Sequence, residues 1–435
     1  MMAIPAKASD SRHSMFTTPN TGYQSSTYRR KQVSSKFSES TTALVLFAAT
    51  FLPMPALHAA EAETDSEFYL RDEEFNLKDM LRFKSADGDF SLRLGGRLHA
   101  DAAWFIDDNN DALNDDSSDY EFRRARLFVS GRAFDDWRYR FEYDFAADSD
   151  YKIKSAWIGY NGFKPVTLRA GNVLVPFSLE EMTSSNNITF MERALPKTFV
   201  PGYRVGALLN THGDNWSAAA GLFDGKIQDG SEDGWGAAAR LTFAPVRSKR
   251  RLLHGGAAVE YREPDEVRYA PRPESHLADR LVRTSTLHDV DNTITAGLEA
   301  AAVYNSFSLQ GEYMQVSVER DNRRSDPDFN GWYVYGSWLV TGENRRYNVK
   351  KGNFKQIRPR SEYGAWELAA RYSAVDLEDS NVTGGEEKNI TLGANWYLNR
   401  NIRFMANYVM TDADPDTNGN KESPDIFQLR AQVIF

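Results

Sequence analysis

The 435-residue sequence contains no cysteine. The chain therefore has no disulfide framework, no thiolate nucleophile and no thiolate-bound metal or iron–sulfur centre. Apart from one short stretch near the N-terminus, it also lacks a run of the ~18 apolar residues that a membrane-spanning helix needs. The formal net charge of -9 argues against general affinity for nucleic acid. A transmembrane β-barrel stays possible, because only every second residue of its strands meets lipid.

The first 60 residues have the features of a secretory signal peptide. A basic cluster at 29–31 precedes the apolar stretch 43–57, and small residues follow at 59–62. A positive flank, a short apolar core and an A-x-A-like end define such a signal. A transmembrane anchor is the alternative, but the apolar stretch is too short for one and contains two prolines. We therefore exclude 1–60 from the fold and interpret 61–89 as an acidic N-terminal lead-in in the periplasm.

The mature chain shows long segments in which apolar and polar residues alternate. In 90–104, Phe90, Leu92, Leu94, Leu98 and Trp104 share one parity, and the charged residues share the other. Successive side chains of a strand point to opposite faces, so this pattern predicts an apolar face backed by a charged one. The segment is longer than the typical strand of about 5–6 residues. It suits the ~9–11 residues with which a tilted strand crosses a bilayer.

Sixteen such segments predict an all-β, antiparallel transmembrane barrel of the outer-membrane porin type, since bacterial barrels have even strand numbers. They lie near 90–105, 120–134, 137–148, 152–161, 165–173, 203–211, 216–224, 234–244, 253–263, 291–305, 307–319, 329–342, 363–377, 387–399, 401–413 and 425–435. The connections alternate between short turns and long or acidic loops such as 106–119, 174–202 and 264–290. This alternation is typical of outer-membrane barrels, which have short periplasmic turns and long outer loops. The long, basic segment 343–362 is the exception on the short-turn side.

Arginine is prominent on the parity that would face the lumen. These arginines are Arg93, Arg97, Arg124, Arg126, Arg132, Arg138 and Arg140 on three neighbouring strands, followed by Arg169, Arg240, Arg371, Arg403 and Arg430. Guanidinium stays charged and its geometry matches phosphate and carboxylate oxygens. Rings of Arg or Lys are the expected lining of an anion pore. The alternative is a structural role, in which these arginines pair with Glu142, Asp144 or Asp101 and hold the wall together.

No motif for catalysis or for a bound cofactor stands out, and we expect no enzyme, no cofactor and no metal site. His99 faces the lumen in this register but has no convincing serine partner, so a solvated pore histidine is favoured over a lipase-like base. The Asp- and Asn-rich segments 107–119 and 412–424 do not meet the full EF-hand spacing. Plain solvated loops are therefore favoured over Ca²⁺ sites.

Three segments resemble the phosphate-selective porin O/P family. They are 121–134 (EFRRARLFVSGRAF), 165–196, which contains PFSLEEMTSS followed by NNITFMERALP, and 332–372. The resemblance covers the whole mature barrel. It implies a sixteen-stranded porin in the outer membrane of a Gram-negative bacterium, surrounded by lipid and lipopolysaccharide, assembled as a homotrimer and taking up phosphate or polyphosphate.

The same resemblance assigns roles to particular residues. The loop 174–202 would fold inward and narrow the pore, and 343–362 would enter the lumen from the periplasmic side. For the anion pathway the resemblance implies Arg97, Arg123 and Arg124, with Arg138 or Arg140 lower down, and the lumen parity adds Arg126 and Arg132. The constriction loop would contain Glu180, Glu181, Ser184, Ser185, Asn186 and Asn187. The inner mouth would contain Arg345, Arg346, Lys350, Lys351, Lys355, Arg358 and Arg360. Arg123 is off the lumen parity, so a β-bulge or the mouth of the strand must accommodate it.

One departure from the family pattern bears on the solute. Phosphate-selective members place lysine just after the Thr-Ser-Ser, where this chain has Asn186 and Asn187. An amide in place of an ammonium removes a charge at the constriction. The sequence therefore predicts a passive porin for phosphate or polyphosphate. The alternatives are a weakly selective porin for other small anions and, from a different class, an exported soluble β-rich binding protein or hydrolase.

Overall fold

The computed structural model describes residues 81–106, 118–147, 152–227, 234–321, 324–415, 421 and 423–435. The expected signal peptide at 1–60, residues 61–80 of the lead-in and most of the acidic segment 107–119 lie outside the described residues. Among the described residues, no helix has the length and apolar character needed to cross a membrane.

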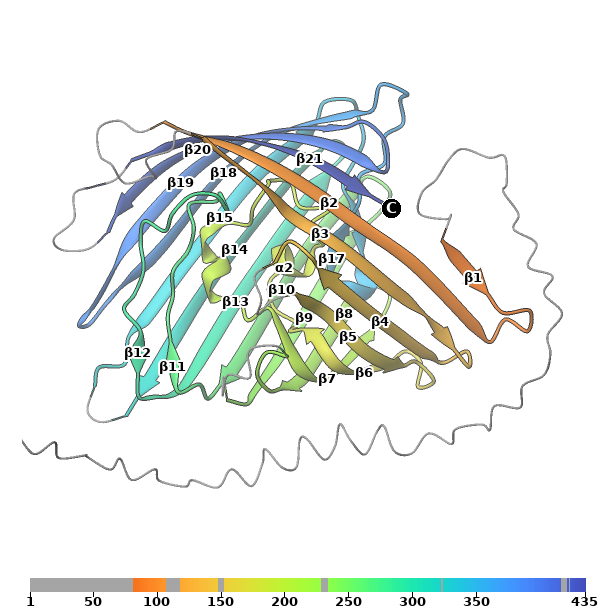
Figure 1. Cartoon of the computed structure of the whole chain (residues 1–435), viewed down its shortest axis with the longest axis horizontal. Coiled ribbons are helices and arrows are strands. Elements are labelled where there is room, and N and C mark those ends of the chain that lie inside the picture. The colour runs from red at the N-terminus through yellow and green to blue at the C-terminus, as the bar shows by residue number, and fades with distance from the viewer. Residues whose placement is uncertain are drawn as a thin grey trace, which may run out of the picture. The chain divides into compact units, whose positions relative to one another are not determined.

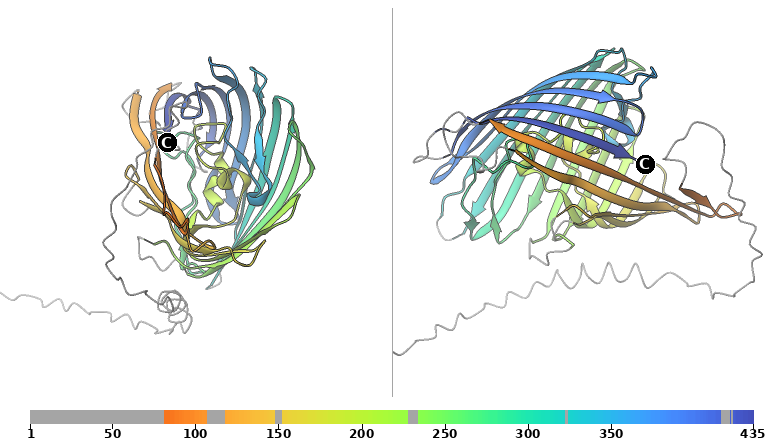
Figure 2. Two further views of the ribbon diagram at one scale, coloured as in Figure 1. Left: turned by 90° about the vertical axis from the view of Figure 1, so that its right-hand side faces the viewer. Right: turned by 45° about the horizontal axis from the view of Figure 1, so that its top comes forward.

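Sixteen of the described strands form one continuous wall. They are β2 (Phe90–Ile106), β3 (Ser118–Ala133), β4 (Trp137–Asp144), β5 (Ile153–Tyr160), β6 (Thr167–Leu174), β7 (Tyr203–His212), β8 (Trp216–Phe223), β9 (Gly236–Arg247), β10 (Arg251–Arg262), β13 (Val290–Tyr304), β14 (Phe307–Arg320), β15 (Asp328–Leu339), β18 (Ala365–Asp379), β19 (Val382–Tyr397), β20 (Ile402–Asp414) and β21 (Asp425–Ile434). Each pairs antiparallel with the next along the chain, and β2 pairs with β21 from Arg97↔Ile434 to Ile106↔Asp425. This pairing closes the barrel seen in Figures 1 and 2, as the alternation predicts.

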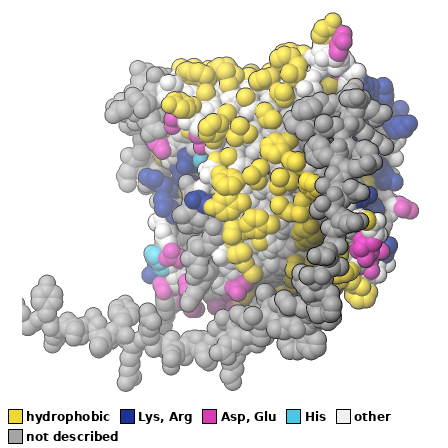
Figure 3. Space-filling view, turned by 45° about the vertical axis from the view of Figure 1, so that its right-hand side comes forward, with side chains coloured by type: hydrophobic (Ala, Val, Ile, Leu, Met, Phe, Trp, Pro, Cys, Tyr) yellow, Lys and Arg dark blue, Asp and Glu magenta, His cyan; other side chains and the backbone are white. Residues whose placement is uncertain are grey.

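The two faces of the wall differ as the sequence parity predicts. On β2, Leu98 and Trp104 are about 40% exposed on the outside, whereas His99 and Asp101 are buried inside. On β9, Leu241 and Phe243 point out while Arg240 and Thr242 point in. Figure 3 shows the resulting apolar surface on the outer side of the wall. An outward apolar band and a polar interior are what a bilayer requires of a barrel.

The two ends of the barrel differ in their connections. At one end, here called the turn end, strands are joined by short turns such as 134–136, 213–215, 248–250 and 305–306. At the other, the loop end, the connections include 175–202 and 263–289, which carries the two-residue strands β11 (Glu266–Val267) and β12 (Leu287–His288). The exception at the turn end is 340–364, which contains β16 (Arg346–Asn348), the 3-10 helix η3 (Val349–Lys351) and β17 (Asn353–Lys355).

One strand boundary predicted from the sequence is wrong by five residues. β19 begins at Val382, not at 387, because a tight turn at Ser380 (φ 57) lets Thr383 pair with Glu378 of β18. The polar, glycine-containing segment 382–386 has the composition of a loop. Strand pairing therefore overrides local preference at this position, as is common in sheets.

The lead-in also contributes one strand. β1 (Arg82–Lys84) pairs with Ser91–Arg93 of β2. It occupies an edge of β2 that β21 leaves open, because β21 ends where Ile434 pairs with Arg97. Pairing this edge removes an exposed row of backbone groups at the turn end.

Loop 175–202 folds into the barrel, as the end-on view in Figure 2 shows. It contains the helix α2 (Leu179–Met182) and the 3-10 helix η2 (Leu195–Phe199). Its apolar side chains Phe177, Leu179, Phe190, Met191 and Leu195 are almost completely buried. The loop is therefore packed inside the lumen as a small hydrophobic core. The cavities described below lie along β2–β9.

Candidate functional site: a cation-lined lumen

Loop 175–202 is tied to the wall formed by β13–β21. Glu312 of β14 accepts hydrogen bonds from the backbone N–H groups of Leu179 and Glu180 at 2.9 and 2.8 Å. Arg403 of β20 donates to the carbonyl oxygens of Ile188 and Thr189 at 2.8 and 3.0 Å. Further ties come from Arg371 to Glu180 and the Glu192 carbonyl, from Asn407 to Met191, and from Arg430 to Glu192. Arg371, Arg403 and Arg430 are thus fully buried structural groups.

Two cavities lie along the opposite wall, β2–β9, in the part of the lumen that the described residues enclose. The loop-side cavity has a volume of ≈ 920 Å³ and the turn-side cavity ≈ 950 Å³. Their linings share seven residues: Arg140, Ser155, Leu174, Met182, Tyr203, Lys351 and Asn353. The two cavities therefore meet at the level of Arg140 and Lys351, and together they run from the loop end to the turn end.

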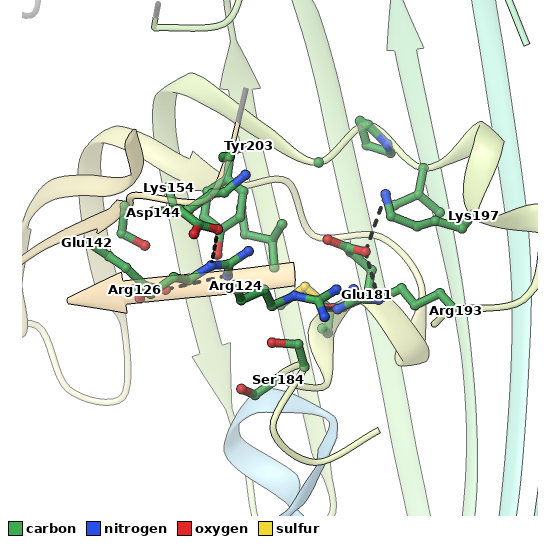
Figure 4. A pocket seen from close by; sticks show the side chains of 18 of the residues that line it. Arg124, Arg126, Glu142, Asp144, Lys154, Glu181, Ser184, Arg193, Lys197 and Tyr203 are labelled. Atoms are coloured by element: carbon green, nitrogen blue, oxygen red, sulfur yellow. Dashed lines mark hydrogen bonds and ion pairs between the residues drawn. The ribbon is translucent and has the colours of Figure 1, made fainter. Parts of the chain in front are cut away.

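Cations dominate the loop-side cavity, part of which is seen in Figure 4. Its lining contains three carboxylates, Glu142, Asp144 and Glu181, against fourteen basic residues: Arg97, Arg123, Arg124, Arg126, Arg140, Lys154, Arg193, Lys197, Arg204, Lys226, Arg268, Arg280, Lys351 and Lys355. The carboxylates are shared rather than matched one to one. Glu142 alone contacts Arg97, Arg126 and Arg140. This arrangement leaves a positive excess while fixing the orientation of each guanidinium group.

A β-bulge places two consecutive arginines inside the lumen. The register of β2 and β3 passes from His99↔Arg124 to Ala100↔Phe122, so Arg123 is the extra residue. Both Arg123 and Arg124 contact Glu192 of loop 175–202, at 3.0 and 3.3 Å. Burial would raise the pKa of Glu192, but Arg123, Arg124 and Arg430 outweigh it and hold this pKa well below its ordinary value.

The turn-side cavity has the more one-sided lining. Its ten basic residues are Arg82, Lys84, Arg93, Arg132, Arg138, Arg140, Arg169, Arg240, Lys350 and Lys351, and none of the described residues that line it is Asp or Glu. Arg169 lies over the ring of Trp157, with its guanidinium carbon 4.9 Å from the ring centre. The charged side chains of its described lining are therefore all cationic.

The predicted constriction residues lie between the cavities and the buried part of the loop. Arg97 donates hydrogen bonds to the hydroxyls of Ser184 and Ser185 at 3.4 and 3.0 Å. The Asn186 side chain lies 3.1 Å from Nε2 of His99, and Asn187 lines the loop-side cavity. These contacts position the Ser-Ser-Asn-Asn segment directly against the arginines of β2 and β3.

Glu180 and Glu181 anchor the loop. Glu180 accepts hydrogen bonds from the Ala194 N–H and from Arg371. Glu181 forms ion pairs with Arg193 at 3.0 Å and with Lys197 at 3.3 Å, as Figure 4 shows. Burial would raise the pKa of Glu181, but Arg193 and Lys197 lower it to about 2. Glu181 is therefore ionised and already paired with two cations, which fits an anchor better than a cation site.

The basic residues of 340–364 lie in different surroundings. Lys350 and Lys351 line the turn-side cavity, and Lys355 lines the loop-side cavity. Arg345 instead is buried, donating to Tyr335 Oη at 2.6 Å and stacking on Phe354 at 3.9 Å. Arg346 lines a third, separate cavity at the turn end.

Several lining residues lie outside the set predicted from sequence. Lys154, Arg204, Lys226, Arg268 and Arg280 line the loop-side cavity. Lys226, Arg268 and Arg280 belong to loops, where no periodicity indicates the side-chain direction. Glu192, which joins the loop to Arg123 and Arg124, lies within the family-like segment 165–196 but carries no signal of its own.

A closed sixteen-stranded barrel with an apolar outer face and a water-accessible, polar lumen defines an outer-membrane porin of a Gram-negative bacterium. The profile of the family described as Phosphate-selective porin O and P matches residues 92–435. The chain belongs to this family. The family and the barrel indicate a channel rather than an enzyme.

Similar proteins agree with this assignment. The chain is 31% identical over 406 residues to Porin O of Pseudomonas aeruginosa, which covers 82% of this chain and 91% of Porin O. Among solved structures, OmpT of Vibrio cholerae, described as a trimer form, has a TM-score of 0.53 and 12% identity over 80% of this chain and 99% of its own. The anion-selective porin from Comamonas acidovorans has a TM-score of 0.51 and 13% identity, covering 80% of this chain and 100% of that porin. Both structures support the fold.

Proposed function

We propose that this porin is selective for anions and that phosphate or polyphosphate is its solute. The observation that carries the proposal is the turn-side cavity, whose lining has ten basic residues and, among described residues, no acidic one. A solute that crosses the barrel along β2–β9 passes this cavity. Cationic linings with low-dielectric walls concentrate anions and exclude cations.

The register of the wall adds a second argument. Arg132 lies directly opposite Arg138, and neither forms an ion pair with a described carboxylate. Like charges placed opposite each other destabilise a sheet by roughly 0.2–1 kcal/mol per pair. Such pairs are expected where positive charge serves a purpose other than stability. Conduction of anions along β2–β4 supplies that purpose.

The pathway in this proposal runs past the arginine ladder on β2–β4. An anion enters among Arg123, Arg124 and Arg126, passes Arg140 and Lys351 where the cavities meet, and leaves past Arg132 and Arg138. Residues two apart on a strand are about 6–7 Å apart, so the anion can exchange one guanidinium for the next. No covalent step is involved, and transport follows the concentration gradient.

A weakly selective porin for other small anions is the second candidate. The observation that favours it is the pair Asn186 and Asn187, which brings amides rather than ammonium groups to the constriction. Asn186 is held against His99 and Asn187 faces the loop-side cavity. Fewer charges at this point weaken the binding of multiply charged anions more than that of chloride.

Planar-bilayer recording of the purified protein tests both candidates. In a KCl gradient we expect a reversal potential of the sign that marks chloride as the more permeant ion; a cation preference would overturn anion selectivity. Phosphate at millimolar concentration should reduce the chloride current if it binds in the lumen. An unchanged current with retained anion preference would favour the second candidate.

We also propose that the protein is a homotrimer, as the OmpT structure of V. cholerae is described. The family membership and the apolar outer face of the barrel support an assembly within the membrane. Sedimentation equilibrium of the detergent-solubilised protein, in a solvent whose density matches that of the detergent, gives the mass of the assembly directly. A monomeric mass would contradict this part of the proposal.

A further inference from the structure

The third cavity lies apart from the anion pathway. Its volume is ≈ 490 Å³, and no residue of its lining belongs to either of the other two cavities. It lies at the turn end, between the β9–β10 turn, the β19–β20 turn and the loop 340–364. Its size falls within the roughly 300–1,000 Å³ of small-molecule sites.

Positive charge is concentrated in this cavity without matching negative charge. Eight of its lining residues are Lys or Arg, and Glu343 is the single carboxylate among the described ones. Glu343 is already engaged, since its carboxylate accepts hydrogen bonds from the Thr341 hydroxyl and from the Arg360 N–H. It therefore has little capacity left to neutralise the surrounding guanidinium groups.

No arginine of this lining forms an ion pair with a described carboxylate, and this includes Arg346, Arg358 and Arg400. They are close enough to affect one another. Repulsion from Arg346, together with partial burial and repulsion from Arg400, lowers the pKa of Arg358. Arg346 and Arg358 likewise add to burial in lowering the pKa of Lys355. Clustered, unneutralised cations of this kind raise the local concentration of anions.

The cavity is also held in shape without a ligand. The Asn344 side chain donates to the Lys249 carbonyl at 2.8 Å, which joins the loop to the β9–β10 turn. Gln356 donates to the Arg400 carbonyl and joins it to the β19–β20 turn. Arg345 fixes the base of the loop through Tyr335 and Phe354. A site that is ordered before binding loses less entropy when a ligand enters.

We propose that this cavity is a second anion site, which binds the phosphate groups of a multiply charged phosphate compound at the mouth of the barrel. Guanidinium groups suit this chemistry because they bind phosphate oxygens in a bidentate manner. Two sources supply the same group at this position: a soluble polyphosphate and the headgroup of an anionic phospholipid. The site does not depend on the selectivity of the pore, because its lining is separate.

The absence of cysteine gives a direct test. Lys249→Cys in the full-length protein places a single thiol at the edge of the cavity for a fluorescent label. This substitution removes one of the eight lining cations, so every further variant is compared with labelled Lys249→Cys itself. We expect inorganic tripolyphosphate to change the fluorescence with a saturable dependence, in nanodiscs of phosphatidylcholine. A hydrogen bond to a charged group contributes about 1.5–3 kcal/mol, so Arg358→Ala or Arg400→Ala should weaken the apparent affinity roughly tenfold or more.

Arg250→Ala is the matched control, because Arg250 belongs to the same β9–β10 turn but does not line the cavity. It should change the apparent affinity less than about twofold, the shift expected from long-range charge alone. An equal loss in Arg250→Ala and Arg358→Ala would overturn the site, as would the absence of any saturable signal. Arg358→Ala should leave the reversal potential in the KCl gradient unchanged, which separates this test from that of the pore.

Nanodiscs containing phosphatidylglycerol distinguish the two sources. If the lipid headgroup occupies the cavity, the response to tripolyphosphate should disappear in these discs and return in phosphatidylcholine. If the soluble compound is the ligand, the response should persist in both. A signal in neither membrane overturns the proposal.

Discussion

Arg132 on β3 and Arg403 on β20 both point into the barrel, but their surroundings are opposite. Arg132 lines the turn-side cavity and faces a second arginine, Arg138, across the strand pair. Arg403 is fully buried beneath loop 175–202 and donates to two backbone carbonyls of that loop. The same residue type thus lines an open cavity on the β2–β9 wall and anchors a loop on the β13–β21 wall. The position of the loop, rather than the strand pattern, assigns the role.

Removing an anchor of loop 175–202 from the β13–β21 wall should give the largest loss of folding stability. Arg371→Ala leaves Glu274 and Glu180 buried without their shared cation, and breaking such a buried pair costs about 3–5 kcal/mol. We expect a lower unfolding midpoint in guanidinium chloride and a larger, noisier single-channel conductance as the loop loosens. Arg169→Ala on the β2–β9 wall is the control, and equal destabilisation by both would contradict the contrast between the walls.

Adding a positive charge where loop 175–202 faces the β2–β9 wall should strengthen phosphate binding on that wall. Asn187→Lys places an ammonium in the loop-side cavity, and a charge-assisted contact to phosphate is worth about 1.5–3 kcal/mol. We expect the phosphate concentration that halves the chloride current to fall roughly tenfold. Asn187→Gln should leave it unchanged, and a similar shift in both variants would show that side-chain size rather than charge is responsible.

Substitutions on the two walls should differ in their effect on selectivity. Arg124→Ala removes a cation from the lining of the loop-side cavity, whereas Arg403→Ala removes one that lines neither of the two pathway cavities. We expect Arg124→Ala to lower the chloride-to-potassium permeability ratio by roughly two- to fivefold, equivalent to about 0.5–1 kcal/mol. Arg403→Ala should change it less. Reversal potentials measure both, and equal changes would refute the assigned pathway.

The anchoring of the loop should depend on pH through Glu181. Its pKa in the folded protein, about 2, lies below the ordinary glutamate value, so its ion pairs stabilise the fold fully above pH ~4.5 and progressively less as the pH falls toward 2. Glu181→Gln should therefore lower Tm by about 2–4 °C at pH 7 and by roughly half as much at pH 3. A constant difference across this pH range would argue against the ion pairs.

The smallest effect should be a gain in stability. Arg132→Gln relieves the repulsion with Arg138, which is worth about 0.2–1 kcal/mol. We expect an unfolding midpoint equal to or slightly above that of the wild type, together with reduced anion preference. Clear destabilisation would mean that Arg132 also has a structural role.

The strand pattern alone predicts much of the architecture. Alternation along 90–104 places Leu98 outside and His99 inside, as observed, because a two-residue period fixes the face of every side chain. It does not predict what fills the lumen. Arg97 and Arg430 both point inward. Strand pairing places Asp101 beside Arg430, but only the packing of loop 175–202 brings Glu192 to it.

Loops carry no such period, and the site depends on them. The basic segment containing Arg345 and Lys351 gives no sequence signal that one residue is buried against Phe354 while the other faces open space. Likewise, nothing local to Glu192 indicates that it meets Arg123 and Arg124, which lie almost seventy positions earlier. Contacts of this kind depend on how the loop returns to the wall.

The extra residue at Arg123 has a consequence for the rest of β3. On its loop-end side, Tyr120 and Phe122 are 84% and 61% exposed, while Glu121 turns inward to meet His276. Excising Arg123 would therefore invert this tip of the strand, carrying two aromatic rings into water and a carboxylate toward the acyl chains. One inserted amino acid thus preserves the outward and inward faces of the strand tip and adds one guanidinium group beside Arg124 in the loop-side cavity.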